Sequence, residues 1–269
     1  MIVNVLIATI DAGIGKVDKI LLETRPDVQY VVSHQVTDEQ YRTIPTALKR
    51  SDVTVGQIEG RGLSRNRNNA LALAGGDIAL LADDDVRYRP EYFEALLDTF
   101  NSDRTIDVAC FKIATPEGAA EYKDYAETSY LLNDQVHHYI SSLEIAFRIK
   151  AVKNRGIVFD QRFGLGSELV SCGEEAVFIH DCIQAGLKVK YYPVYVVEHA
   201  LQSTTRSRTE YATENNIFKG AYDARRFGWK AFPAAFIGTL QLWPALRKEG
   251  KNPLQYLGER LRGAFYIYR

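Results

Sequence analysis

The sequence has few cysteines, and those present are far apart along the chain. Cys110, Cys172 and Cys182 are the only three among 269 residues, and they form no CxxC pair. Small secreted domains and cysteine-based zinc sites depend on paired or closely spaced cysteines. The count therefore argues against a disulfide framework and indicates free thiols in a reducing compartment.

The chain also lacks a long hydrophobic run. No stretch reaches the roughly 20 apolar residues that a helix needs to cross a bilayer. Residues 1–7 lack the basic start and the cleavage site of a signal peptide. We therefore expect a cytoplasmic protein, either free or attached peripherally to the inner face of the cell membrane.

The chain has almost no net charge, but its charges are distributed unevenly. A formal net charge of −1 gives no overall field that would favour nucleic acid as a partner. Residues 203–269 contain 12 Lys and Arg against 5 Asp and Glu, a net of +7, which leaves −8 for residues 1–202. We therefore predict a main domain over residues 1–202 and a basic, aromatic-rich helical extension over residues 203–269.

Strand-like and helix-like segments alternate in the first half of the chain. Short apolar runs predict strands over residues 2–8, 29–33, 52–55 and 78–82. Helical spacing predicts helices over residues 14–23, over residues 64–73 and after Pro90. This alternation is typical of an α/β fold with a mainly parallel sheet flanked by helices. Ligands of such sheets bind beyond the carboxyl ends of the strands.

The second half is more mixed. We expect a helix over residues 174–185, and strands over residues 107–113, 141–148 and 188–197. Pro193 predicts that the last strand lies at a sheet edge or is broken there. In the basic extension, residues 231–246 have the spacing of an amphipathic helix, which Pro233 would begin and Pro244 would end.

Three adjacent carboxylates, Asp83, Asp84 and Asp85, follow the apolar run 78–82. In a strand, the first and third would point to the same side. Carboxylate oxygens that converge in this way suit Mg²⁺ or Mn²⁺ carrying substrate phosphates. The alternative is a solvated acidic turn, but polar residues usually precede such a turn, whereas an apolar run precedes this one. We therefore predict a divalent metal site here.

Two further features carry possible chemistry. Glu174 and Glu175 follow Gly173 and open a predicted helix. Acidic residues are favoured in a first helical turn by the helix dipole, and the functional alternative is a general base that deprotonates an acceptor hydroxyl. His199 closes the last strand-like segment and is either an ordinary histidine or a metal ligand.

Taken in order, these motifs resemble those of the family 2 glycosyltransferases, of the kind that build bacterial polysaccharides. Thr9 follows the first strand, and residues 62–70 (Gly-Leu-Ser-Arg-Asn-Arg-Asn-Asn-Ala) are similar to the family's Gly-x-Ser-x-x-Arg-Asn helix start. The three aspartates stand in the place of its DxD motif. Residues 159–166 (Phe-Asp-Gln-Arg-Phe-Gly-Leu-Gly) are similar to its FDErFG segment, and residues 173–175 stand where Gly-Glu-Asp is usual. The resemblance covers roughly residues 1–200.

The resemblance implies a GT-A fold and an inverting transfer from a nucleoside diphosphate sugar, with a UDP-sugar expected. The acceptor would be a saccharide or a lipid-linked saccharide in surface polysaccharide synthesis. Asp85 would bind Mn²⁺ or Mg²⁺, with His199 and Asp83 as the other residues of the metal site, Asp83 through the ribose or a metal-bound water.

The resemblance also implies contacts with the donor. Thr9, Asp83 and Asp84 would lie against the nucleotide sugar. Arg65 or Arg67 would meet its diphosphate, because a guanidinium matches phosphate oxygens in bidentate fashion.

Glu175 would be the base, alone or with Glu174. It replaces the usual aspartate and is one methylene longer, and a displacement of about 1 Å matters to catalysis. A second departure lies at residues 33–35, Ser-His-Gln, where members usually carry an aspartate that helps to bind the nucleotide.

Two other classes of function stay open. A sugar-phosphate nucleotidyltransferase also uses a metal and an α/β sheet, but it would carry a Gly-rich phosphate loop. Residues 13–16, Gly-Ile-Gly-Lys, match such a loop only in part. A non-catalytic nucleotide- or carbohydrate-binding module would not need Asp83, Asp85, Glu175 and His199 together.

The basic extension suggests attachment to a membrane surface. Four large apolar residues recur at helical spacing on one predicted face: Phe232, Phe236, Leu240 and Trp243. Cations flank this segment at residues 225–226 and 247–248. Aromatic residues beside cations suit the interface of anionic lipids. The alternative is that this face packs on the main domain.

Overall fold

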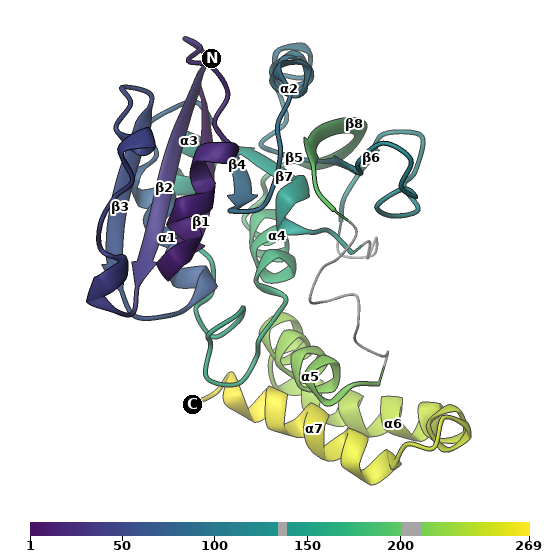
Figure 1. Cartoon of the computed structure of the whole chain (residues 1–269). Coiled ribbons are helices and arrows are strands. Elements are labelled where there is room, and N and C mark those ends of the chain that lie inside the picture. The colour runs from purple at the N-terminus through teal and green to yellow at the C-terminus, as the bar shows by residue number, and fades with distance from the viewer. Residues whose placement is uncertain (134–138, 201–210) are drawn as a thin grey trace.

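A mixed sheet forms the centre of the protein (Figure 1) in the computed structural model, which describes residues 1–133, 139–200 and 211–269. Within these residues the strand order is β3-β2-β1-β4-β7-β5-β8-β6. The strands are β1 (Val3–Ile10), β2 (Val28–Val36), β3 (Val53–Glu59), β4 (Ile78–Asp83), β5 (Val108–Ala114), β6 (Tyr130–Leu131), β7 (Ile145–Arg148) and β8 (Val189–Glu198). Strands β3, β2, β1 and β4 are parallel, whereas β7 is antiparallel to β4 and β5. The predicted α/β class, with helices flanking the sheet, is confirmed.

Helices cover both faces of the sheet, because successive side chains of a buried strand point to opposite sides. One face packs against the 3₁₀ helix η1 (Asp11–Lys19) and α2 (Pro90–Ser102). The other face packs against α1 (Leu63–Leu73), α3 (Ile149–Asn154) and α4 (Glu174–Gln184). Shorter 3₁₀ turns are η2 (Glu39–Tyr41), η3 (Thr46–Leu48), η4 (Ser142–Glu144) and η5 (Gly228–Lys230).

Three predicted elements differ from the structure. The helix expected over residues 14–23 is the 3₁₀ helix η1, since two glycines in this short segment disfavour an α-helix. The strand expected over residues 141–148 begins only at Ile145, because Ser141 and Glu144 form a capping box that makes the preceding residues a 3₁₀ turn. Pro244 lies inside a helix and does not end it.

The prediction for Pro193 is confirmed. The pairing of β8 with β5 shifts register between Tyr191 and Tyr195, on either side of the proline. β6 pairs with β8 only at Lys190 and Tyr191. Between Tyr191 and the bridge from Glu198 to Arg87, no described strand pairs with β8 on the side away from β5, so a proline there costs no hydrogen bond of the ladder.

Three helices follow the sheet: α5 (Thr213–Phe227), α6 (Ala231–Lys248) and α7 (Pro253–Tyr266). They form a separate layer at the lower end of the molecule in Figure 1. Two glycines let α5 and α7 approach closely: a Cβ atom on Gly220 would lie 1.9 Å from the Arg260 carbonyl oxygen, and one on Gly263 would lie 2.0 Å from that of Ile217. The predicted domain boundary after residue 202 lies outside the described residues.

α6 is the predicted amphipathic helix, but it is longer than expected and continues through Pro244 to Lys248. The proline leaves the carbonyl of Leu240 without its helical donor, and Leu240 is 68% exposed, so water can replace that donor. In the part of the chain that the structure describes, no helix is long and apolar enough to cross a membrane.

Candidate functional site

A cleft of about 1030 Å³ opens at the carboxyl ends of β1 and β4. Its walls come from these strand ends, from the loop before α1, from residues 139–143 and 165–176, and from α5. Parallel strands end at the same edge of a sheet, which gathers their last residues at one place. The three aspartates at the end of β4 line this cleft together with both glutamates of α4.

Asp83 ends β4 and faces a buried arginine. The Arg67 Nη2 atom lies 3.2 Å from Asp83 Oδ1, and Arg67 Nη1 donates to Glu174 Oε1 at 2.7 Å. Only 3% of the Arg67 side chain is exposed. Burial in the cleft raises the pKa of Asp83, and the Arg67 charge opposes that rise. Arg67 thus connects the carboxylate at the end of β4 to the start of α4.

Asp84 points to the first strand. The Thr9 hydroxyl donates to Asp84 Oδ2 at 2.6 Å, and Lys16 Nζ lies 4.0 Å from Asp84 Oδ1. A Cβ atom on Gly13 would lie 2.2 Å from Asp84 Oδ2 and 2.4 Å from Thr9 Oγ1. The glycine and lysine that resembled a phosphate loop therefore surround a carboxylate.

Asp85 and His199 form the pair that the sequence predicted as metal ligands. His199 Nε2 lies 3.3 Å from Asp85 Oδ1. The hydrogen bond between them raises the pKa of His199 and lowers that of Asp85. Tyr122 packs edge-on against the imidazole, at 5.9 Å between ring centroids, and fixes its orientation.

Asp83 does not join this pair. Among the residues that the structure describes, no group of three or more Asp, Glu, His or Cys side chains is arranged to hold a metal ion by itself. Asp83 is instead oriented toward Arg67. A cation here would take two protein ligands, and its other ligands would come from substrate oxygens or water.

Glu174 and Glu175 begin α4 after Gly173, whose φ of 82° is accessible mainly to glycine. Both side chains are buried. Glu174 is paired with Arg67. Burial, followed by the adjacent Glu174 charge, raises the pKa of Glu175 to about 8. The two glutamates are therefore in different electrostatic surroundings, although they are neighbours in the sequence.

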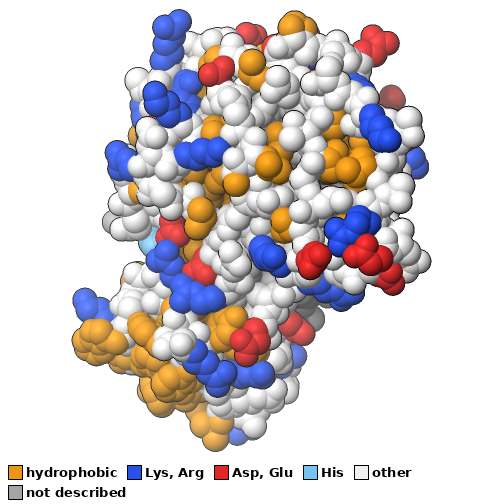
Figure 2. All heavy atoms as spheres, turned by 90° about the vertical axis from the view of Figure 1, so that its left-hand side faces the viewer, with side chains coloured by type: hydrophobic (Ala, Val, Ile, Leu, Met, Phe, Trp, Pro, Cys, Tyr) orange, Lys and Arg blue, Asp and Glu red, His pale blue; other side chains and the backbone are white. Residues whose placement is uncertain are grey.

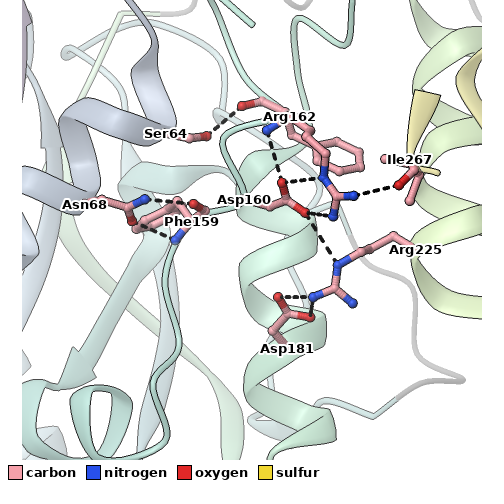
Figure 3. Close-up of polar contacts among 9 residues, drawn as sticks. Ser64, Asn68, Phe159, Asp160, Arg162, Asp181, Arg225 and Ile267 are labelled. Carbon is pink, nitrogen blue, oxygen red and sulfur yellow. Dashed lines mark hydrogen bonds and ion pairs between the residues drawn. The ribbon is translucent and has the colours of Figure 1, made fainter. Parts of the chain in front are cut away.

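The start of α1 and segment 159–166, the two other motifs of the resemblance, hold each other in place. Asn68 of α1 makes two hydrogen bonds to the Phe159 backbone, at 2.8 and 2.7 Å, and Ser64 donates to the Phe163 carbonyl at 2.6 Å (Figure 3). A Cβ atom on Gly164 would lie 3.0 Å from Glu174 Oε2. Segment 159–166 therefore positions both α1 and the glutamate pair.

The same segment ties the C-terminal helices to the main domain (Figure 3). Asp160 accepts hydrogen bonds from Arg162, whose Nη1 atom donates to the Ile267 carbonyl at 2.8 Å. Arg225 of α5 lies 3.5 Å from Asp160 and makes two bonds of 2.8 Å to Asp181 of α4. The extension is thus joined to the elements that carry the site.

The structure changes what was expected of the two arginines that would meet the diphosphate of the donor. Arg65 does not line the cleft: its side chain is exposed and donates to the Glu59 carbonyl at 2.5 Å. Arg67 lines the cleft but is already paired with two carboxylates. Arg61, an exposed cation two residues before the helix, lines the cleft in addition. Arg61 lies in the loop between β3 and α1, and this position is the feature of the sequence that could have identified it as a cleft residue.

Further residues line the cleft. Asp11 follows β1 and accepts two hydrogen bonds from Thr37, and Gln35 of β2 donates to the Gly62 carbonyl at 3.1 Å. Phe218 and Lys219 come from α5. No motif in residues 203–269 marks these two, because a helix face becomes part of a site only through tertiary packing.

Comparisons with known proteins bear on this arrangement. The family model described as glycosyl transferase family 2 matches residues 37–161. The matched residues contain Arg67 and the three aspartates, and they lie between Thr9 and the Glu174–Glu175 pair. The comparison with curated proteins gives no significant match.

Crystal structures of TarS from S. aureus share the fold. The TarS 1–349 structure superposes with a TM-score of 0.55 at 16% identity, and the match covers 84% of this chain and 65% of that one. The TarS 1–349 complex with UDP-GlcNAc gives the same TM-score and identity, over 84% and 66%. The complex with UDP gives 0.55 at 17% identity, over 83% and 66%. The chain therefore has a GT-A fold, and its residues 37–161 are similar to glycosyl transferase family 2.

Proposed function

We propose that the chain transfers a sugar, with inversion, from a nucleoside diphosphate sugar to an acceptor hydroxyl. One observation carries the proposal: a single cleft holds the Asp85–His199 pair and the buried Glu175 carboxyl group. The Asp85–His199 pair suits a cation bound to the leaving diphosphate, and the Glu175 carboxyl group suits a base that deprotonates the acceptor.

The donor set at Asp85 and His199 fits Mn²⁺ or Mg²⁺. Adjacent ligands of an octahedral cation, each at about 2.1 Å, lie about 3 Å apart, and the observed separation is 3.3 Å. Asp85 and His199 would hold the cation. When bound, it would neutralise charge that develops on the diphosphate as the sugar leaves.

A uridine diphosphate sugar is the donor we propose. The TarS complexes with UDP-GlcNAc and UDP show that a protein of this fold binds such ligands. Thr9 and Asp84 would lie against the nucleotide sugar, and Arg61 would meet the diphosphate as an exposed cation in the cleft. Arg67 would act on the donor indirectly, by orienting Asp83.

Glu175 is the base we propose. Its carboxylate takes the proton of the acceptor hydroxyl, and the acceptor oxygen forms a bond to the anomeric carbon. The bond from that carbon to the diphosphate oxygen breaks, and the diphosphate leaves with the electron pair. A raised pKa brings a carboxylate closer to the basicity that proton abstraction needs.

The acceptor we propose is a saccharide or a lipid-linked saccharide used in surface polysaccharide synthesis in the cytoplasm. Phe218 and Lys219 of α5 line the same cleft as Glu175, and the Phe218 ring lies against Gly173, just before the glutamate pair. An aromatic ring offers a sugar an apolar face to pack on, and an ammonium group suits an acceptor with a nearby anionic group.

The alternatives fit less well. A nucleotidyltransferase needs a phosphate loop, whereas Gly13 and Lys16 surround Asp84. A binding module has no use for a buried carboxyl group whose pKa is about 8, since its burial costs stability.

Incubation of the full chain with a panel of nucleotide sugars separates the three functions. We expect nucleoside diphosphate release from one member, fastest with a uridine nucleotide. Pyrophosphate exchange would indicate a nucleotidyltransferase, and binding without turnover would indicate a module. Glu175→Gln should lower turnover by roughly 10² or more while donor binding survives. If Glu174→Gln is inactive and Glu175→Gln is active, the base is Glu174.

A further inference from the structure

The outward face of α6 is apolar. Its inward face, formed by Ala231, Ala235, Thr239 and Leu246, is buried. Phe236, Ile237 and Leu240 point the other way and are 51%, 57% and 68% exposed. A surface helix of a globular protein normally carries polar residues there. Of the four residues of the predicted face, Phe236 and Leu240 are therefore not packed on the main domain, and the predicted alternative is wrong for these two.

Aromatic residues of the neighbouring elements extend this face. Phe232 of α6 contacts Phe265 of α7 at 4.7 Å and Tyr268 at 5.9 Å between ring centroids. Trp229, in the turn before α6, is 70% exposed. We call the set Trp229, Phe236, Ile237, Leu240, Phe265 and Tyr268 the C-terminal apolar face. Figure 2 shows hydrophobic side chains gathered on the lower lobe of the molecule, which these helices form.

Cations border the C-terminal apolar face. Residues 227–269 contain seven Lys and Arg and two Asp and Glu. Exposed cations stand at each end of α6, at Lys230 on one side and at Arg247 and Lys248 on the other. Blue side chains lie beside the hydrophobic area of the lower lobe in Figure 2. An apolar surface with a cationic border is complementary to a membrane that carries anionic headgroups.

We propose that the C-terminal apolar face binds the surface of a membrane containing anionic lipids, without crossing it. The aromatic and aliphatic side chains would enter the boundary between headgroups and acyl chains, and the bordering cations would lie against lipid phosphates. A second copy of the chain is a poorer occupant. A two-fold interface would place the same cations opposite one another, and like charges repel.

The surface lies on the lobe that also borders the cleft. α5 supplies Phe218 and Lys219 to the cleft wall and packs against both α6 and α7. Docking would therefore place the cleft near the lipid surface, separated from it by α5 and α6. This placement suits an acceptor anchored in the membrane, but the docking itself does not depend on the proposed reaction.

Sedimentation of the full chain with vesicles tests the proposal. We compare vesicles of phosphatidylcholine with vesicles that also contain phosphatidylglycerol, at low and high salt. The chain should sediment with the anionic vesicles at low salt, and added salt should weaken binding. The triple substitution Phe236→Ser, Ile237→Ser and Leu240→Ser should weaken binding at least tenfold, as should Arg247→Glu with Lys248→Glu.

Matched controls are available on the main domain. Leu131 and Val158 are 52% and 54% exposed, so their double substitution by Ser removes exposed apolar side chains elsewhere. Lys19→Glu with Lys49→Glu makes the same charge change at two exposed lysines. Both control variants should bind as the unmodified chain does. Circular dichroism should show that all variants keep their helix content.

Several results would overturn the proposal. The chain could stay in the supernatant at low salt with both vesicle types, or the triple variant could bind as well as its control. Equal, salt-insensitive binding to both vesicle types would rule out the anionic component. Light scattering that shows a stable dimer, lost in the triple variant, together with no vesicle binding, would assign the face to self-association.

Discussion

Arg67 contacts only one of the two adjacent glutamates of α4, and this difference separates their roles. The guanidinium pairs with Glu174 and Asp83 and packs over the Phe159 ring at 5.7 Å. It thereby holds one carboxylate from each side of the cleft in a fixed position. Glu175 lies outside this pairing, and burial followed by the Glu174 charge raises the pKa of its carboxyl group to about 8.

The raised pKa of Glu175 predicts how the rate depends on pH. A base acts only when deprotonated, and its pKa of about 8 lies above the usual carboxylate range. The value of kcat/KM should therefore rise roughly tenfold per pH unit below about 7 and level off above about 8. Glu175→Gln should lose this dependence, whereas Glu117→Gln, at an exposed position, should keep it. A profile that is flat from about pH 6 to pH 9 would contradict the assignment.

Asp85 predicts dependence on a divalent cation. Activity should need Mn²⁺ or Mg²⁺, and Asp85→Ala should reduce it by roughly 10² or more, since the leaving diphosphate loses its counter-charge. Calorimetry of Mn²⁺ binding in the presence of UDP should show the same loss for Asp85→Ala. Asp98→Ala removes an exposed aspartate of α2 and should change neither measurement. Full turnover in EDTA would disprove the cation's role.

The α5–α7 pair shows how two glycines set the position of a whole element. The atoms that a Cβ on Gly220 or Gly263 would meet are backbone atoms of the opposite helix. These backbone atoms cannot move aside unless the two helices separate. Because α5 also supplies part of the cleft wall, close packing on α7 determines where Phe218 and Lys219 stand.

Gly263→Ala should therefore destabilise the chain. Its Cβ would lie 2.0 Å from the Ile217 carbonyl oxygen, and overpacking of this kind costs about 1–3 kcal/mol. Gly258→Ala is the control on the same helix, because nothing lies within 4 Å of a Cβ there. That change should be neutral or stabilise by up to about 1 kcal/mol. Urea unfolding of both variants measures the difference, and equal midpoints would show that the helices can separate without cost.

Across the whole molecule, the features that could be predicted from the sequence are those that local residue patterns specify. The apolar runs of β1 and β4 and the aspartates after β4 identified the fold and one side of the site. The pairing of Arg67 with Glu174 joins residues 107 positions apart, and no local pattern encodes it. The same holds for Phe218 and Lys219, whose place in the cleft depends on how α5 packs.

The charge change near residue 203 predicted a boundary between the main domain and a helical extension, and the contacts of α5 and α7 predict that removal of this extension damages the main domain. Phe163, Val170 and Val177 are buried against Ile217, Ala221 and Tyr266, and Arg225 is paired with Asp160 and Asp181. Exposing an apolar side chain of this size costs about 1.5–3 kcal/mol, so three would remove several kcal/mol of a total that is typically about 5–15 kcal/mol.

A chain ending at residue 202 should therefore unfold at a markedly lower temperature and lose nucleotide-sugar turnover. The triple variant at Phe236, Ile237 and Leu240 provides the contrast, because it keeps every helix and changes only exposed side chains. It should retain both stability and turnover of a soluble acceptor, since neither depends on the outward face of α6. Thermal unfolding and diphosphate release measure the two properties. A truncated chain as stable and active as the full one would instead show that residues 203–269 are an independent unit, attached to the catalytic domain without supporting it.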